Sequence, residues 1–161
     1  MKVLDTHLHL WDPSVLRYDW LIDVPPLHRP FAARELAEAT ADVPTDVSLK
    51  YIFMQAGAAD EQALAEVDWV SGLAEHLPIA GIIAFAPVEL GAGVGTHLDA
   101  LREHSLVRGV RRMTQDEAPG FGVSDALAGK HILITGGGTG IGLACASRLR
   151  ADGAIVTIMG R

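Results

Sequence analysis

A chain of 161 residues has room for roughly one ordinary domain, whereas a complete (β/α)8 barrel needs roughly 250 residues. Its 49% hydrophobic and 20% charged residues are typical of a soluble globular protein, and the absence of any apolar run of about 18 residues excludes a membrane span. The formal charge of -7 and the scattered basic residues exclude an extended nucleic-acid surface.

The first predicted element is a strand over residues 2–10, whose side chains alternate between two faces. On this alternation one face carries Val3, Asp5, His7 and His9. Two imidazoles that leave the same face can converge on one metal ion, and Asp5 could orient one of them as a hydrogen-bond acceptor. Taken alone, a histidine pair on a strand is explained as well by packing or by surface exposure.

Further along the chain, apolar segments alternate between strand and helix patterns. We predict a loop over 11–30, a short helix over 31–39, strands over 46–55, 79–87 and 106–111, and two helices whose N-caps are Asp60 and Thr96. After a turn-rich segment we predict a strand over 131–135, a glycine turn, a helix over 141–151 and a strand over 155–159. The alternation predicts an α/β fold of parallel strands with crossover helices.

Several motifs, in the right order, resemble those of the amidohydrolase-related lactonases, the L-fuconolactonase and L-rhamnonolactonase branch. They are Asp5-Thr6-His7-Leu8-His9-Leu10-Trp11-Asp12-Pro13, Tyr18-Asp19-Trp20-Leu21, Gln55-Ala56, Gly109-Val110-Arg111-Arg112 and Gln115-Asp116-Glu117. The resemblance covers residues 1 to about 121 and implies a partial (β/α)8 barrel of about four βα units. It also implies that His7 and His9 bind a divalent metal, Zn or Mn, and that Gln55 and Arg111 bind the substrate, a small sugar-acid lactone.

The implied chemistry is attack of water on a lactone carbonyl, with a metal or a positive side chain stabilising the oxyanion and a carboxylate taking the proton. That carboxylate and the family's later histidines belong to strands beyond residue 121. We therefore expect a hydrolase fragment that is incomplete and inactive alone, and we assign no catalytic residue. Gln55 could instead cap a strand end, and Arg111 could pair with Asp116 or Glu117. We expect His76, His97 and His104 on solvated helix faces.

The segment Thr135-Gly136-Gly137-Gly138-Thr139-Gly140-Ile141-Gly142 supplies glycines and free helix N-terminal amides, which together favour phosphate binding. Its T-G-x-x-x-G-I-G spacing and its flanks, Leu127-Ala128-Gly129-Lys130 and Ala151-Asp152-Gly153-Ala154, resemble the short-chain dehydrogenase/reductase family over residues 125–161. The resemblance implies a dinucleotide site formed by Gly136, Thr139, Gly140, Ile141 and Gly142. It also implies that Arg161 favours NADP, unless Arg161 is a solvated terminus. That family's catalytic residues would lie beyond residue 161.

We therefore expect a partial barrel over 1–121, a junction over 122–128 and a partial Rossmann-type βαβ unit over 129–161. The leading interpretation is a chimeric or truncated polypeptide; the alternatives are an error of sequence assembly, a nucleotide-binding module without catalysis and a poorly stable product. Unpaired strand edges predict self-association, unless the βαβ unit adds its strands to the first sheet.

The single cysteine, Cys145, cannot form an internal disulfide, and no signal-peptide pattern precedes Asp5. We expect residence in the cytoplasm.

Overall fold

A computed structural model describes residues 1–114, 129–135, 138–151 and 153–159 of the chain. Its contacts divide the chain into two compact units, Met1–Met113 and Thr114–Arg161. The predicted junction, 122–128, lies outside the described residues. Each unit is therefore described by itself.

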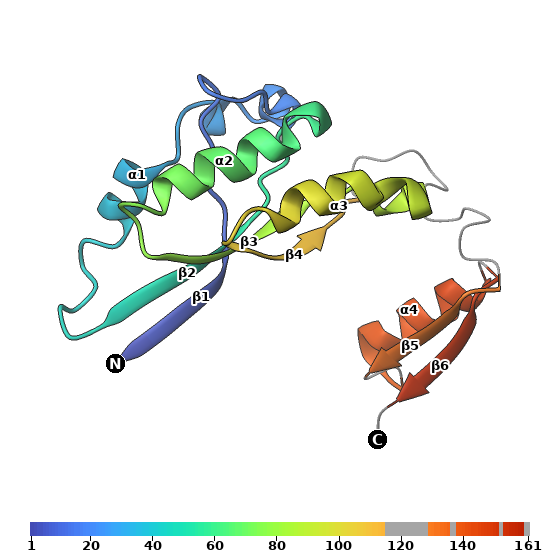
Figure 1. The fold of residues 1–161 in the computed structure, drawn as a ribbon. Helices are drawn as coiled ribbons and strands as arrows, with labels where there is room; N and C mark the ends of the chain where they lie inside the picture. Colours follow the sequence, from blue (N-terminus) through green and yellow to red (C-terminus); the bar gives the residue numbers. More distant parts are fainter. Residues whose placement is uncertain (115–128, 136–137, 152, 160–161) are drawn as a thin grey trace. The chain divides into compact units, whose positions relative to one another are not determined.

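The first unit alternates strands with helices, as the sequence predicts (Figure 1). Its strands are β1 (Lys2–Leu8), β2 (Ser48–Met54), β3 (Ile79–Phe85) and β4 (Val107–Arg111). Its α-helices are α1 (Ala33–Ala39), α2 (Ala63–Leu73) and α3 (Gly95–Arg102). Short 3-10 helices occupy the connections: η1 (Asp19–Asp23), η2 (Pro25–Leu27), η3 (Asp60–Gln62) and η4 (Val88–Val94).

The four strands form one parallel sheet in the order β1-β2-β3-β4, so each strand lies beside the next one in the sequence. Sequential parallel order is the order of a (β/α)8 barrel, whereas doubly wound sheets reverse direction from their first strand. Because all four strands run the same way, their carboxyl ends meet at one edge of the sheet. The loops that follow the strands meet there too.

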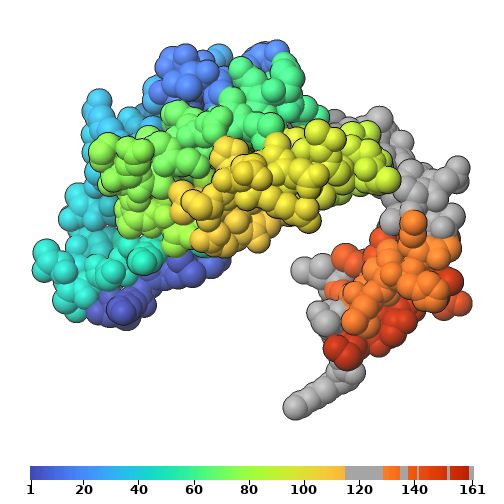
Figure 2. Space-filling model, viewed as in Figure 1, coloured from blue at the N-terminus to red at the C-terminus, as the bar shows by residue number. Residues whose placement is uncertain are grey.

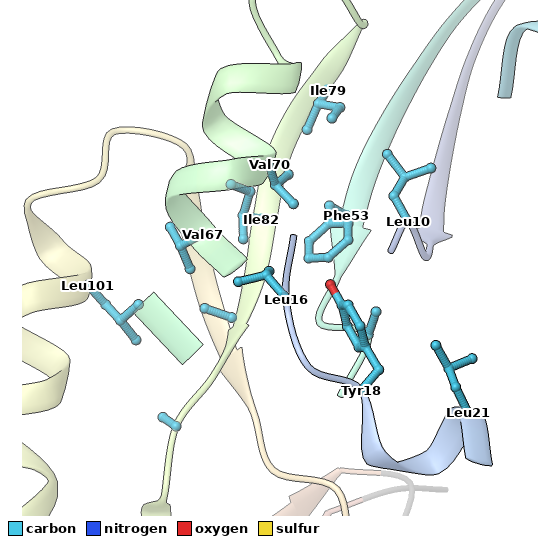
Figure 3. Packing of buried hydrophobic residues seen from close by; sticks show 13 residues of the cluster. Leu10, Leu16, Tyr18, Leu21, Phe53, Val67, Val70, Ile79, Ile82 and Leu101 are labelled. Atoms are coloured by element: carbon cyan, nitrogen blue, oxygen red, sulfur yellow. The ribbon is translucent and has the colours of Figure 1, made fainter. Parts of the chain in front are cut away.

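One face of the sheet is covered by helices. Phe53 and Ile82 are register partners, so they share a face, and both are fully buried. Val67 and Val70 of α2 and Leu101 of α3 belong to the same apolar cluster (Figure 3). In the space-filling view the atoms of α2 and α3 form a continuous green-to-yellow surface (Figure 2). The hydrophobic core of the unit lies between this sheet face and its helices.

The opposite face of the sheet is also apolar, and its residues are absent from the core cluster. Ile52 and Ile83 are chain neighbours of Phe53 and Ile82, so they point to this other face, where both are only half-buried. Leu4, whose register partner Lys50 lies two residues before Ile52, is 52% exposed on the same face. We call this surface, formed by Leu4, Ile52, Met54 and Ile83, the open face.

The predicted alternation of β1 is wrong in one respect. Asp5 pairs with Tyr51 and Leu8 pairs with Phe53, so three steps along β1 match two along β2. Tyr51 and Phe53 share a face, and their partners Asp5 and Leu8 must share it as well. His9, the next residue after Leu8, therefore points to the open face, and Asp5 does not.

The predicted N-caps are also wrong. The N-cap of α2 is Gln62, because η3 inserts a 3-10 turn at Asp60–Gln62 before the helix begins. The N-cap of α3 is Val94, which places Thr96 inside the helix. Neither cap makes a side-chain hydrogen bond. Packing of the helices against the sheet, rather than capping, sets where they begin.

The second unit is the predicted βαβ unit. Strands β5 (His131–Thr135) and β6 (Ile155–Met159) are parallel and pair in continuous register from His131↔Ile155 to Thr135↔Met159. Helix α4 (Gly140–Ala151) connects them. Neither unit, over the residues described, contains a helix with the length and hydropathy needed to cross a membrane.

The buried position of Ile82 gives a stability prediction. Ile82→Val removes one methyl group from the core and should lower the free energy of unfolding by about 0.5–1.5 kcal/mol. Urea denaturation followed by tryptophan fluorescence measures this for the first unit alone, because all three tryptophans, Trp11, Trp20 and Trp69, lie in it. Ile22→Val is the matched control, since Ile22 is 70% exposed, and should change stability by less than about 0.5 kcal/mol. Equal losses in the two variants would contradict the assignment of the core.

Candidate functional site

Two imidazoles meet at the carboxyl end of β1. The Nε2 atoms of His7 and His9 are 3.0 Å apart, and their ring centroids are 4.8 Å apart at an interplanar angle of 71°. The side chains converge as the sequence predicts. They do so on the open face, where the bulge in β1 directs them.

A backbone carbonyl fixes the orientation of one ring. Nδ1 of His9 lies 2.9 Å from the carbonyl oxygen of Met54, at the end of β2. Because a carbonyl oxygen only accepts, Nδ1 carries the proton, and Nε2 of neutral His9 presents a lone pair. Desolvation by burial lowers the pKa of His9, and electrostatic interactions with His7 and Arg111 add to the lowering, while hydrogen bonding to the Met54 carbonyl opposes it. His9 is therefore neutral at pH 7.

Asp5 does not orient an imidazole ring. Its Oδ1 accepts a hydrogen bond of 2.9 Å from the backbone N–H of His7. This contact is an Asx turn, and it lies in the segment between Asp5 and Leu8 where the register of β1 shifts. The acceptor that holds a histidine ring is the Met54 carbonyl, which no side-chain pattern in the sequence can reveal.

Gln55 directly follows β2 and is 2% exposed. Its Oε1 accepts a hydrogen bond of 2.8 Å from the N–H of Gly57, and its backbone N–H donates to the carbonyl of Ile83 at 2.9 Å. The side-chain oxygen thus closes the turn after β2. The amide NH2 is the part of Gln55 left to meet a substrate, and substrate binding by Gln55 stays a prediction.

Arg111 ends β4 and shares the face of its register partner Phe85. Its Nη1 atom is buried without a hydrogen-bond partner among the described residues. A buried guanidinium nitrogen normally donates a hydrogen bond. The Nη1 atom of Arg111 can therefore donate to an acceptor that the described residues do not supply. The alternative partners named from the sequence, Asp116 and Glu117, lie outside the described residues.

The neighbouring arginine is engaged differently. Nε of Arg112 donates to both carboxylate oxygens of Glu89 at 3.1 Å, and its guanidinium lies 5.2 Å from the centroid of the Phe85 ring. Arg112 therefore ties η4 to the end of β4.

A buried acid that the sequence motifs do not include lies next to the loop after β2. Glu66 of α2 is 2% exposed, and its Oε1 accepts a hydrogen bond of 3.2 Å from the N–H of Ala56. Burial raises the pKa of Glu66 to about 7, while hydrogen bonds from the backbone of Ala56 and Ala58 oppose the rise. The signal was present in the sequence, because Glu66 lies on the buried stripe of α2 between Ala63 and Val70.

Tyr18 lies beside this acid. Its hydroxyl is buried and has no hydrogen-bond partner in bonding geometry within the described residues. Desolvation, and after it the negative charge of Glu66, raises the pKa of Tyr18, so the phenol is neutral. An uncharged phenol and a carboxyl with a pKa of about 7 are thus buried together next to the loop after β2.

Aromatic side chains fasten the loop after β1 to the loop after β2. Nε1 of Trp20 donates to the carbonyl of Ala56 at 2.9 Å. Gly57 has φ of +79° and packs against the Trp20 ring, which a Cβ at that position would meet at 3.4 Å. Trp11 stacks edge-on against Trp20, with ring centroids 5.5 Å apart. The two loops therefore form one packed layer beside the histidines.

No further ligand joins the histidine pair over residues 1–114 or the described part of the second unit, where no three His, Cys, Asp or Glu side chains are grouped so as to hold a metal ion. The expectation for His97 is wrong: it is half-buried, and its Nε2 lies 3.0 Å from the Phe85 carbonyl oxygen. His104 is also half-buried, with Nδ1 3.6 Å from the Asp68 carboxylate, whereas His76 is exposed as expected.

A hollow of about 370 Å³ lies away from these residues, at the amino end of the sheet. Its lining includes Leu36 of α1, Leu49 of β2 and Pro78, which precedes β3. None of the predicted site residues lines it.

The glycine turn of the second unit is described in part. Thr139 and Gly140 are exposed, Gly140 has φ of +56°, and α4 begins there as a phosphate-binding turn requires. Gly142 and Ile141 lie in the first turn of α4. Gly136 and Arg161 lie outside the described residues.

Comparison with known proteins supports the fold of the chain. No protein-family model matches this sequence, and no curated protein matches it. The solved structure described as Amidohydrolase 2 from Bifidobacterium longum subsp. infantis is similar, with a TM-score of 0.55 at 20% identity over 99% of this chain and 60% of that one. The chain thus has the α/β fold of an amidohydrolase structure and spans about 60% of that structure's length.

Glu66 makes the stability of the first unit depend on pH. Its pKa is 4.5 when exposed and about 7 when buried, so the folded state binds the proton more tightly. Its contribution is fully present below pH 4.5, and about 3 kcal/mol of stability is lost as the pH rises through 7. Glu66→Gln cannot ionise, and its free energy of unfolding should fall less between pH 5 and 8.

The test is the difference between wild type and variant in urea denaturation at several pH values, which cancels the opposite contribution of His9. Glu75→Gln is the matched control, since Glu75 is exposed just beyond the end of α2, and should follow the wild type. If Glu66→Gln also follows the wild type, Glu66 is not the buried titrating group.

Proposed function

We propose that the carboxyl end of this sheet is part of a metal-dependent hydrolase site that acts on a sugar-acid lactone. One observation carries the proposal: two imidazole Nε2 atoms converge at 3.0 Å while a backbone carbonyl holds the opposite nitrogen of one ring. Metal-binding histidines are typically held in this way by their second ring nitrogen. The fold likeness to a protein described as Amidohydrolase 2 supports the same reaction class.

The two rings fit a divalent ion such as zinc or manganese. A tetrahedral zinc with Zn–N bonds of about 2.0–2.1 Å separates two ligand nitrogens by about 3.3 Å, close to the present 3.0 Å. His9 already presents the required lone pair, and His7 presents one when its proton moves to Nδ1. When bound, such a metal polarises a carbonyl oxygen and acidifies water.

Arg111 is proposed to hold the substrate. Its buried Nη1 lacks an acceptor among the described residues, and its charge is felt by His9. A lactone carbonyl that gains negative charge, or the carboxylate product, would supply that acceptor. Gln55 is proposed to donate a hydrogen bond from its amide NH2 to the substrate, while its side-chain oxygen accepts the hydrogen bond from Gly57.

Proton transfer is the step that the described residues do not support. Attack by water on a lactone requires a base, and no Asp or Glu joins the two histidines in the described ranges. We therefore propose that the chain alone binds metal but does not hydrolyse lactones at a measurable rate. The activity of a whole amidohydrolase is proposed only for an assembly that supplies the missing base.

Zinc binding tests the metal site. Isothermal titration calorimetry of the apoprotein should detect zinc binding that His9→Ala weakens at least about tenfold, because half of the described ligand set is lost. His76→Ala is the matched control, since His76 is exposed near the end of α2, and should bind as the wild type does. Hydrolysis of an aldonolactone, followed by proton release, should stay at the background rate. Zinc binding that survives His9→Ala would rule out this metal site.

The parallel βαβ arrangement of the second unit supports a second candidate, a dinucleotide-binding fragment of the short-chain dehydrogenase type. The turn that carries Thr139 and Gly140 would hold the pyrophosphate at the start of α4, together with Gly136, Ile141 and Gly142. Arg161 is proposed to pair with the 2'-phosphate of NADP. A fusion product without a working site is the remaining alternative.

Titration with NADP and NAD, followed by amide NMR shifts, tests the second candidate. If Arg161 meets the 2'-phosphate, Arg161→Ala should reduce the preference for NADP over NAD about tenfold. Arg150→Ala is the control, since Arg150 is exposed at the other end of α4. The absence of shifts at Thr139 and Gly140 with either nucleotide would rule out the site.

A further inference from the structure

Both edges of the four-stranded sheet are open in the described part of the chain. Strand β1 pairs only with β2, and β4 pairs only with β3. Each edge strand therefore presents unpaired backbone N–H and C=O groups along one side. The two edges are complementary, because all strands are parallel and a β4 edge can receive a β1 edge in the same direction.

The open face adds an apolar surface to these edges. Leu4 is 52% exposed there, beside half-buried Ile52, Met54 and Ile83. Helices α1, α2 and α3 pack on the other face, and parallel sheets are normally covered on both faces. Leaving this face in water forgoes the burial that stabilises such sheets.

We infer that a second copy of this chain covers the open face, with β1 of each copy pairing with β4 of the other. Two sheets of four strands then close into a barrel of eight parallel strands, with the helices of both copies outside. An eight-stranded barrel has an interior that side chains just fill, and the apolar side chains of the open face would occupy it. A two-fold axis joins both pairs of edges, so the assembly stops at two copies.

Side chains of the two neighbouring strands cover Gly81, the register partner of Ile52 on the open face. A Cβ at Gly81 would lie 2.8 Å from Cγ of Arg108 and 3.1 Å from Cδ1 of Ile52. Lys50 lies on the open face near the start of β2 and can extend its ammonium to water at the amino end of a barrel.

The pairing also supplies what the candidate site lacks. In a barrel of two such sheets the two β1 strands are opposite each other, and each carries His7 and His9 at its carboxyl end. Four imidazole rings then lie at the mouth of one barrel, whereas a single chain contributes only the two rings of His7 and His9. This part of the inference rests on the proposed metal site, and the pairing of strands does not.

Sedimentation velocity of the full chain tests the pairing. We expect a species of twice the chain mass, and Leu4→Glu should weaken the association on the order of 100-fold or more, because it replaces an apolar side chain by a carboxylate that the pairing would desolvate. In the separate chain Leu4 is half exposed, so the variant should keep the wild-type circular dichroism. Val15→Glu is the matched control, since Val15 is 51% exposed in the loop after β1, and should remain paired.

The number of zinc ions bound separates the two parts of the inference. One zinc per two chains supports both the pairing and the shared site. A dimer that binds one zinc per chain, or none, keeps the pairing and overturns the shared site. A monomer, whose open face would then be covered by β5 and β6 or by other polypeptide, overturns the pairing. An assembly of more than two copies, or a dimer that Leu4→Glu leaves intact, also overturns the pairing.

Discussion

The extra residue in β1 is the constraint on which the rest of this site depends. Three steps from Asp5 to Leu8 match the two steps from Tyr51 to Phe53. Leu8 can therefore face the helices while His9 points to the open face. A regular strand would place Asp5 and His9 on the same side and leave an acid beside the rings. The irregularity replaces that acid with the Met54 carbonyl, which fixes the tautomer of His9, while burial lowers the pKa of the ring.

The loops after β1 and β2 are held in place by contacts within the chain, so their conformation does not depend on a bound substrate. Gln55 and Glu66 bond the backbone just after β2, and Trp20 bonds the same loop from the side of β1. A site at the mouth of a parallel sheet needs such support, because loops are otherwise the mobile part of the fold. The acid of this support has a pKa of about 7, so the stability of the loop layer changes with pH near neutrality.

The sequence predicts the order of strands and helices well, because β1 alternates between polar and apolar residues and β3 is an apolar run, and strand patterns of these kinds alternate with helix patterns along the chain. It predicts convergence of His7 and His9 for the same local reason. It does not predict the bulge, which arises from pairing with a strand more than forty residues away. The N-cap at Asp60 fails because a 3-10 turn precedes α2, and Glu66 is missed because an acid on an apolar stripe is ordinarily exposed.

At the carboxyl end of the sheet, the Met54 carbonyl of β2 fixes the proton of His9 on Nδ1, and burial keeps the ring neutral. Long-range 1H–15N correlation of the imidazole rings in the metal-free protein at pH 7 tests it most directly, with His9→Gln identifying the signals. We expect a neutral His9 ring protonated at Nδ1 and unprotonated at Nε2. A proton on Nε2, or a charged ring at pH 7, would contradict it, since His9 would then have no lone pair to offer a metal.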